Sequence, residues 1–438
     1  MTPVGNSPEQ SITVNGVDVE SAGASAPIPL SIGENKIKIK VTAGNGDYKF
    51  HTLTVIRSDS SGNGNNGNGS GEGNSGQIDP VAWTKTIEDD TIIMSSNKDE
   101  NRAELSILVA EIVKHKGLRV EMPNLTLDLP TDLIGSRRGS AQQWMNGSLE
   151  INISELEEFE AQKLLNRAMV SQYAQLKPFG PLFEIDIKLV ANDGAEKTIN
   201  QPVILRFPVD PSIRPQASGI YRIDMDGTLG FIGGKLEGGQ WVAEVQHQGQ
   251  YGVLSLHKTF ADVPSGHWAS GAIERLAAML IVNGTSKETL DPDKWTTRAE
   301  FIAMLMRALK IEAEGELTFT DIRPGSWYEE AIASAVGAGI VTGKSDSIFD
   351  PNGRMTREEM VTVMMRAYRV LKGTDLNETE ASAFNDEAAV ASWGLNAVRA
   401  AASLQIIQGR TPSLFAPKET ATRAEAVIML TRIMNEMD

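Results

Sequence analysis

The C-terminal part of this 438-residue chain contains one pattern three times. Each copy has Thr-Arg-x-Glu followed by apolar residues at helical spacing, and the copies begin at Thr297, Thr356 and Thr422. The threonine and the glutamate three residues later form a capping box, in which each side chain bonds the main-chain amide of the other. Because the apolar residues then recur every three or four positions, each copy predicts a helix with one buried face.

The repeat extends well beyond this helix. Upstream of each capping box come an aromatic-x-Asp, a tryptophan, a glycine and an apolar-x-Pro turn, in the same order. Equivalent tryptophans and equivalent arginines are both 59 residues apart between the first two copies and 66 between the last two. A helix pair of this size buries too little apolar surface by itself, so we expect the three repeats to pack against one another.

This triplet resembles the S-layer homology domain family, whose motifs occur here in the family's order over about residues 257–438. The resemblance implies an all-α, pseudo-threefold module with repeats over 257–315, 316–378 and 379–438. It also implies that the module holds a secreted protein on the outside of the cell by binding a pyruvylated secondary cell-wall polysaccharide. The residues alone predict three helical repeats that each present an arginine at a helix start.

These arginines, Arg298, Arg357 and Arg423, directly follow the N-cap. The free amides and the positive dipole end of a helix suit an anion there. An arginine fork can hold the carboxylate of a ketal-linked pyruvate with two parallel hydrogen bonds. A dipole or salt-bridge role is the alternative, and the resemblance favours the ligand role.

The resemblance implies that the aspartates, tryptophans and glycines of each repeat also belong to the glycan site. The tryptophans can offer a flat face to a sugar ring, although core packing is at least as good an interpretation. The aspartates can orient the arginines or accept bonds from sugar hydroxyls, although an Asp ahead of a helix is most often a cap. The residues concerned are Asp262, Asp321, Asp386, Trp268, Trp327, Trp393, Gly284, Gly343 and Gly409.

The three copies differ at the residue after the glycine. The second and third carry a cation there, Lys344 and Arg410, whereas the first carries Thr285. Family resemblance implies that this cation joins the arginine in contact with the ligand. We therefore expect unequal affinity among the grooves between repeats.

The composition of the chain excludes some classes of binding partner. A formal charge of −16 and a pI near 4.9 argue against nucleic acid or an anionic membrane as a partner. The chain has no cysteine, its five histidines are scattered, and no run of eighteen apolar residues occurs. We expect no cofactor, no metal and no membrane span.

The N-terminus, Met1 to Asn6, lacks the basic and apolar regions of a signal peptide. For a protein expected in the cell wall or S-layer, this predicts a processed or truncated piece of a longer exported chain.

Residues 1–57 predict strands, since 11–19, 35–41 and 51–57 alternate apolar and polar side chains. The segment resembles a cadherin-like β-sandwich, although it is short for a complete one. Residues 58–79 are rich in Gly, Asn and Ser and predict a flexible linker.

Residues 80–256 predict a mostly-β (α+β) spacer domain. Helical spacing predicts helices over 102–115 and 154–176, the second opened by a capping box of Ser154 and Glu157. Alternation predicts strands over 118–122, 125–129, 149–153, 183–189 and 202–207 and a β-meander over 219–254.

No pattern in the chain predicts an active site. Asp224 and Asp226 supply half of a calcium loop but are better explained by a hairpin turn. The glutamates at 155–160 could be paired carboxylates, yet a negative first helical turn explains them more simply.

We therefore expect a multidomain, non-enzymatic surface protein whose partners are pyruvylated wall polysaccharide and other surface proteins. Two alternatives stay open. One is the C-terminal anchoring portion of a large exported glycan-degrading enzyme. The other is a self-assembling S-layer subunit.

Overall fold

The computed structural model describes residues 11–14, 17–19, 33–42, 48–57, 83–96, 101–130, 144–199, 202–209, 218–246, 248–373 and 384–437. The chain divides into two units, Met1–Ile78 and Asp79–Asp438. The linker predicted over 58–79 lies outside the described residues, and the finer domain boundaries stay predictions.

The first unit contains a four-stranded antiparallel sheet in the order β2-β1-β3-β4. The strands are β1 (Ser11–Val14), β2 (Val17–Val19), β3 (Gly33–Thr42) and β4 (Tyr48–Arg57). Ile12, Val14 and Ile37 are buried. The predicted strands of this segment are confirmed.

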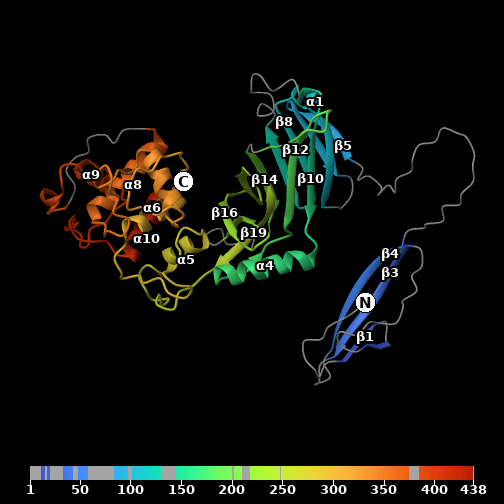
Figure 1. Ribbon diagram of the computed structural model, residues 1–438, viewed down its shortest axis with the longest axis horizontal. Coiled ribbons are helices and arrows are strands. Elements are labelled where there is room, and N and C mark those ends of the chain that lie inside the picture. Colours follow the sequence, from blue (N-terminus) through green and yellow to red (C-terminus); the bar gives the residue numbers. More distant parts are fainter. Residues whose placement is uncertain are drawn as a thin grey trace, which may run out of the picture. The chain divides into compact units, whose positions relative to one another are not determined.

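The β-rich part of the second unit contains two sheets (Figure 1). The first has the order β16-β15-β19-β12-β10-β7, with β11 beside β19 and β13 beside β12. Its strands are β7 (Arg102–Leu108), β10 (Ser148–Glu155), β11 (Gln175–Pro178), β12 (Phe183–Val190), β13 (Glu196–Thr198), β15 (Ser218–Ile223), β16 (Leu229–Gly233) and β19 (Gly249–His257).

The second sheet has the order β17-β18-β14-β9-β8-β6-β5. Its strands are β5 (Trp83–Glu88), β6 (Thr91–Ser96), β8 (Gly117–Met122), β9 (Leu125–Pro130), β14 (Val203–Pro208), β17 (Lys235–Glu237) and β18 (Gln240–Val245). All its pairs are antiparallel except β6 with β8.

One core lies between the two sheets. Leu127 and Leu205 from the second sheet and Ile151 and Ile187 from the first are fully or almost fully buried within it. Every second residue of these strands turns inward, as expected for a sheet with one buried face. The predicted strands in this region are confirmed.

Three sequence predictions here were wrong. Residues 102–108 form strand β7, because Ala103, Leu105 and Ile107 alternate inward, and only α1 (Val109–Ile112) follows as a helical turn. Ser154 is paired within β10, between β7 and β12, and caps no helix. Helix α4 (Glu158–Gln172) begins later, after Glu157, without a side-chain cap.

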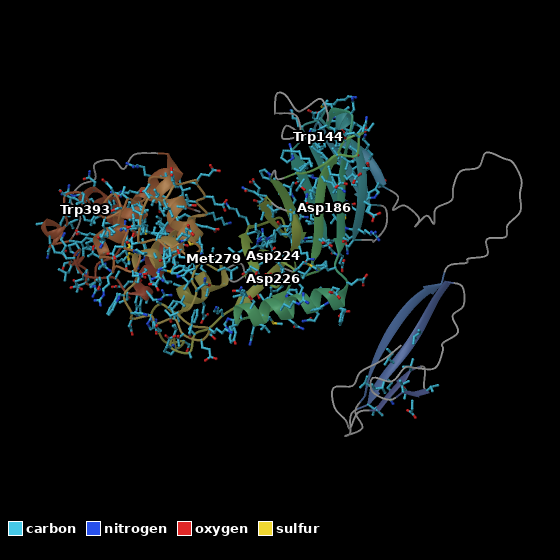
Figure 2. The ribbon with its side chains drawn as sticks, in the orientation of Figure 1. Trp144, Asp186, Asp224, Asp226, Met279 and Trp393 are labelled. Atoms are coloured by element: carbon cyan, nitrogen blue, oxygen red, sulfur yellow. The ribbon has the colours of Figure 1, made fainter. Side chains whose placement is uncertain are left out.

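The third wrong prediction is the single meander. Strands β15, β16 and β19 lie in the first sheet, whereas β17 and β18 lie in the second. The turn at Asp224–Thr228 is a hairpin as predicted, with Gly227 N donating to Asp224 O at 2.8 Å. Figure 2 shows Asp224 and Asp226 together at this turn. The Thr228 amide bonds the Asp226 carboxylate and lowers its pKa.

The C-terminal part is helical and has a shared apolar core drawn from all three repeats. Its helices are α5 (Ser270–Ala278), α6 (Arg298–Leu309), α7 (Glu329–Gly337), α8 (Arg357–Lys372), the 3₁₀ turn η2 (Glu387–Ala389), α9 (Leu395–Ser403) and α10 (Arg423–Met437). None of the helices in the described ranges is long and apolar enough to cross a membrane.

The repeats are joined in a closed ring. The amide of each arginine that opens α6, α8 or α10 donates at 2.9 Å to a carbonyl oxygen of another repeat. The pairs are Arg298 with Gly353, Arg357 with Glu419, and Arg423 with Lys294. Since the last pair leads from the third repeat back to the first, no repeat is terminal.

Candidate functional site

Each helix start in the ring is fixed by its capping box. Thr297, Thr356 and Thr422 accept from the amide of the glutamate three residues on, at 3.2 or 3.3 Å. Their own amides donate to that glutamate's carboxylate at 2.8 Å. The three predicted capping boxes are confirmed, and they place the next residue, an arginine, at the end of a helix.

Each arginine side chain reaches the glycine loop of another repeat, and we call this contact a junction. The first junction joins Arg298 to loop 342–350, the second joins Arg357 to loop 408–416, and the third joins Arg423 to loop 283–291. The arginines are only 8%, 3% and 4% exposed. They are buried connectors between repeats.

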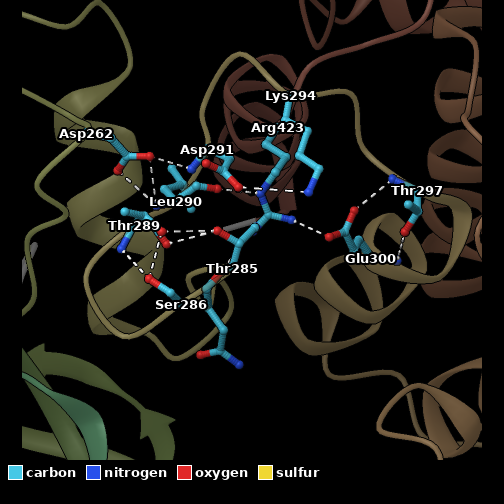
Figure 3. A network of polar contacts seen from close by, with 11 residues as sticks. Asp262, Thr285, Ser286, Thr289, Leu290, Asp291, Lys294, Thr297, Glu300 and Arg423 are labelled. Carbon is cyan, nitrogen blue, oxygen red and sulfur yellow. Dashed lines mark hydrogen bonds and ion pairs between the residues drawn. The ribbon is translucent and has the colours of Figure 1, made fainter.

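Main-chain carbonyl oxygens receive most of the guanidinium hydrogen bonds. Arg357 Nε donates to Phe415 O at 2.8 Å and its Nη2 to Gln408 O at 2.9 Å. Arg423 makes the equivalent bonds to Leu290 O and Asn283 O, at 2.8 and 2.9 Å (Figure 3). Each of these two arginines therefore spans the two ends of one loop.

A glutamate completes two of these junctions. Arg423 Nη1 lies 2.9 Å from the Glu300 carboxylate, and Arg357 Nη1 lies 3.3 Å from that of Glu425. Arg357 and Arg298 each have a lowered pKa, because burial penalises the charged guanidinium. Both nevertheless stay charged at neutral pH, as arginine does in proteins.

Arg298 differs from the other two. Its Nη2 donates to Thr342 O at 2.7 Å, but its buried Nε has no hydrogen-bond partner in the described part of the chain. The guanidinium instead lies over the Phe349 ring, 4.7 Å from its centroid. The first junction thus keeps a guanidinium N–H unused.

The aspartates hold the apolar-x-Pro turns rather than capping a helix. Asp262 accepts from the amides of Leu290 and Asp291, as Figure 3 shows. Asp321 and Asp386 accept in the same way from residues 349–350 and 415–416, at 2.7 to 2.9 Å. They therefore position the loops that the arginines contact. Their bonding to sugar hydroxyls stays a prediction.

The tryptophans are surface residues, and the core-packing interpretation was wrong. Trp268, Trp327 and Trp393 are 62%, 61% and 54% exposed. Trp268 stacks on His267, and Trp327 meets Tyr328 edge-on. Figure 2 shows Trp393 at the surface of the helical part.

The loop glycines are required sterically. A Cβ on Gly284, Gly343 or Gly409 would lie 2.2 to 2.3 Å from the carbonyl oxygen two residues on. The loops can therefore fold as they do only with glycine at these positions. Direct ligand contact by the glycines stays a prediction.

The cations after the glycines are more exposed than the arginines. Lys344 lies 2.8 Å from the Asp350 carboxylate. Arg410 lies 2.8 Å from Glu419 and 3.3 Å from Glu425, which also pairs with Arg357. Thr285 Oγ1 lies within hydrogen-bond distance of Thr289 O and Thr289 Oγ1 in its own loop. The third junction therefore lacks a cation directly after its glycine, and its exposed cation is instead Lys294, 3.9 Å from the Asp291 carboxylate.

Sequence reasoning missed two elements of the junctions. Phe349 and Phe415 lie under the guanidiniums of Arg298 and Arg357, at 4.7 and 5.1 Å. The aromatic in the apolar-x-Pro turn was a signal for this contact, and Leu290 breaks it in the first repeat. Glu358 is buried and accepts from Lys418 and the Ala391 amide.

Comparison with known proteins decides the family of the repeats. The sequence model of the S-layer homology domain matches residues 259–302, 318–361 and 383–427. The three repeats are S-layer homology domains. A cadherin-like β-sandwich domain model matches residues 1–58. Both resemblances inferred from the sequence are confirmed, and the S-layer homology domains indicate association with the cell surface.

Relatives share these domains within much longer chains. An amylopullulanase of Thermoanaerobacterium thermosulfurigenes is 30% identical over 352 residues, 79% of this chain and 18% of the relative. The exoglucanase XynX of Acetivibrio thermocellus is 42% identical over 182 residues, 41% of this chain and 16% of the relative. The S-layer protein sap of Bacillus anthracis is 34% identical over 176 residues, 40% of this chain and 21% of the relative. The chain spans about a fifth or less of the length of each.

Proposed function

We propose that the S-layer homology domains anchor this protein to the cell wall by binding a pyruvylated secondary polysaccharide at the junctions between repeats. The observation that carries the proposal is the recurring junction itself, a helix N-terminus and its arginine set against the glycine loop of another repeat. In this proposal the closed ring is a pseudo-threefold, all-α module.

The chemistry of the first two junctions suits a carboxylate. Lys344 and Arg410 have partly exposed side chains, and both now pair with carboxylates of the protein. A pyruvate carboxylate can take the place of Asp350 or Glu419 as a hydrogen-bond acceptor. The nearby helix N-terminus favours the negative charge.

The arginines contribute in two ways. They fix the loops through bonds to carbonyl oxygens, and they place positive charge beneath the proposed ligand. All three guanidiniums are almost fully buried, and the Arg298 Nε that has no partner among the described residues is itself buried, so we expect direct contact with the glycan to fall to Lys344 and Arg410. The exposed tryptophans offer ring faces on which a sugar can stack. A repeating polymer that occupies more than one junction gains avidity.

Calorimetric titration of the full 438-residue chain tests the proposal. We expect binding to pyruvylated wall polysaccharide and little heat with the same polymer after mild acid removal of pyruvate. Equal binding to both polymers would contradict a role for the ketal carboxylate, and no binding to either would contradict the anchoring function.

Single substitutions locate the contact. Lys344→Ala and Arg410→Ala are partly exposed changes, so each should weaken binding while leaving the unfolding temperature nearly unchanged. Arg298→Ala, Arg357→Ala and Arg423→Ala should weaken binding and destabilise the fold together. Wall binding unchanged in all five variants would exclude the junctions as the site.

We further propose that this chain acts by binding rather than by catalysis. A second candidate is the anchoring portion of a longer glycan-degrading enzyme, favoured by the alignment with an amylopullulanase over 79% of this chain. The longer gene product, or glycan hydrolysis by it, would establish this. A third is an S-layer subunit, favoured by the similarity to S-layer protein sap. Ordered two-dimensional arrays of the purified chain would establish that role.

A further inference from the structure

The first repeat contacts the β-rich part of its own unit at three separate places. Tyr221 Oη donates to Ala278 O at 2.7 Å. Lys310 Nζ donates to Ile232 O at 2.5 Å. Lys287 Nζ donates to Tyr173 Oη at 3.1 Å and lies 4.2 Å from the centroid of that ring. We call these contacts the seam.

The seam is continuous with an apolar core. Tyr221 is fully buried, and Ala278 is only 2% exposed. Both belong to a cluster with residues of helix α4 and strand β19, among them Leu164, Leu165 and Leu254. A buried cluster of this kind stabilises the contact by removing apolar surface from water. The β-rich part and the first repeat are thus packed as one body at this point.

The other two repeats have different side chains at the seam positions. With the 59- and 66-residue offsets, Ala278 corresponds to Gly337 and Ser403, Lys287 to Asp346 and Pro412, and Lys310 to Arg369 and Asn435. The backbone agrees at one equivalent position, where Leu280, Gly339 and Gln405 all have positive φ. The first repeat is therefore distinguished by its side chains, at the positions that meet the β-rich part.

The glycine loop of the first repeat carries the most informative difference. In the other repeats the cation directly follows the glycine, as Lys344 and Arg410, and pairs with acids of the module. In the first repeat that position is Thr285, and the loop's cation is Lys287, which contacts Tyr173 of the β-rich part. This same loop receives Arg423 at the third junction.

We propose that the first repeat, through Ala278, Lys310 and Lys287 of its glycine loop, is a docking surface for the β-rich domain, which fixes the anchor's orientation and leaves the glycan to the first and second junctions. The part of this inference that concerns glycan rests on the proposed function. The docking itself rests on the seam. Two measurements on the full chain test the docking and the glycan part separately.

The first measurement is the distance between spin labels. The chain has no cysteine, so Lys197→Cys on β13 and Glu330→Cys on α7 give two exposed, unique labelling sites. We expect one narrow distance distribution in the otherwise native chain. Adding Tyr173→Ala, Lys287→Ala, Tyr221→Phe and Lys310→Ala together should broaden it. A broad distribution in the native chain, or an equally narrow one in a folded seam variant, would overturn the docking.

The second measurement compares Lys287→Ala with the matched variant Lys344→Ala in titrations with pyruvylated wall polysaccharide. Lys344→Ala should weaken binding by about tenfold, as expected for one lost charge-assisted hydrogen bond. Lys287→Ala should change affinity by less than about twofold, because its partner is Tyr173. Equal weakening by both variants would assign the first loop to the glycan and overturn the proposal. If the native chain binds no glycan, the proposed function fails, and the label distances still decide the docking.

Discussion

Asp386 and Arg357 hold the same residue, Phe415, by its two main-chain polar groups. The Asp386 carboxylate accepts from Phe415 N at 2.9 Å, and Arg357 Nε donates to Phe415 O at 2.8 Å. Asp262 and Arg423 hold Leu290 in the same way. Since the aspartate and the arginine belong to different repeats, a pair of charges that recurs at two junctions sets both the loop shape and the packing between repeats.

Asp321 holds the turn at Phe349 and Asp350 as Asp386 and Asp262 hold theirs, and acid should weaken this contact. Burial opposes the shift, but the amides of Phe349 and Asp350 outweigh it and lower the pKa of Asp321 below its ordinary value of 3.8. The stabilisation is therefore complete above about pH 4 and is lost as pH falls through the folded-state pKa. Asp321→Asn should cost about 1 kcal/mol at pH 7 and less at an acidic pH well below 3.8, measured by urea unfolding. An equal cost at both pH values would contradict this account.

Substitution by alanine should have a small effect on stability at an exposed tryptophan and a large one at a buried tryptophan. Trp327→Ala should change the free energy of unfolding by less than about 0.5 kcal/mol, because the ring is mostly in water. It should nevertheless weaken binding to wall polysaccharide. The matched change Trp241→Ala, at a side chain 3% exposed in the β-rich core, should cost about 3–5 kcal/mol. A large loss of stability in Trp327→Ala would show that Trp327 has a packing role.

The glycine loops should not tolerate a methyl group. In Gly409→Ala the new Cβ would lie 2.3 Å from Thr411 O and 2.5 Å from Leu414 O, so the main chain must move. We expect a loss of about 2 kcal/mol or more in unfolding free energy. Gly266→Ala is the control, because nothing lies within 4 Å of its added Cβ. Similar small effects from both variants would show that the loop can relax.

The third repeat carries a strained alanine. Ala416 has φ of 60°, where its counterparts are Asp291 and Asp350, and alanine is disfavoured in the left-handed region. Ala416→Gly should stabilise the chain by about 0.5–1 kcal/mol, measured by thermal unfolding. Ala402→Gly within α9 should instead destabilise it by about that amount. If both variants are destabilised, the packing of the Ala416 methyl group contributes more to stability than the left-handed backbone at Ala416 costs.

Local signals in the sequence predicted the repeats well. The capping boxes depend on residues three apart, so Thr297 and Glu300 were sufficient to place the start of α6. Strands such as β12 were predicted because their alternation is complete. Residues 102–108 satisfy both helical and alternating spacing, and only pairing with β10 decides for a strand.

The site was predictable as a set of residues but not as contacts. The repeat offsets selected the arginines, aspartates and glycines, yet the distance along the chain gives no indication that Arg423 meets Asn283. Exposure of the tryptophans depends on what the folded repeats leave uncovered. Lys287 gave no signal, because its role depends on Tyr173 in another domain.

The closed ring also has a mechanical consequence. An open solenoid can unravel from an end repeat, which has only one neighbour. Here Arg423 N and Ala424 N bond carbonyl oxygens of Lys294 and Pro292, so the last repeat is fastened to the first. A pull on the chain from its N-terminal side meets no terminal repeat that can peel away alone. The anchor must yield as a whole, which suits a part that bears load at the surface of a cell.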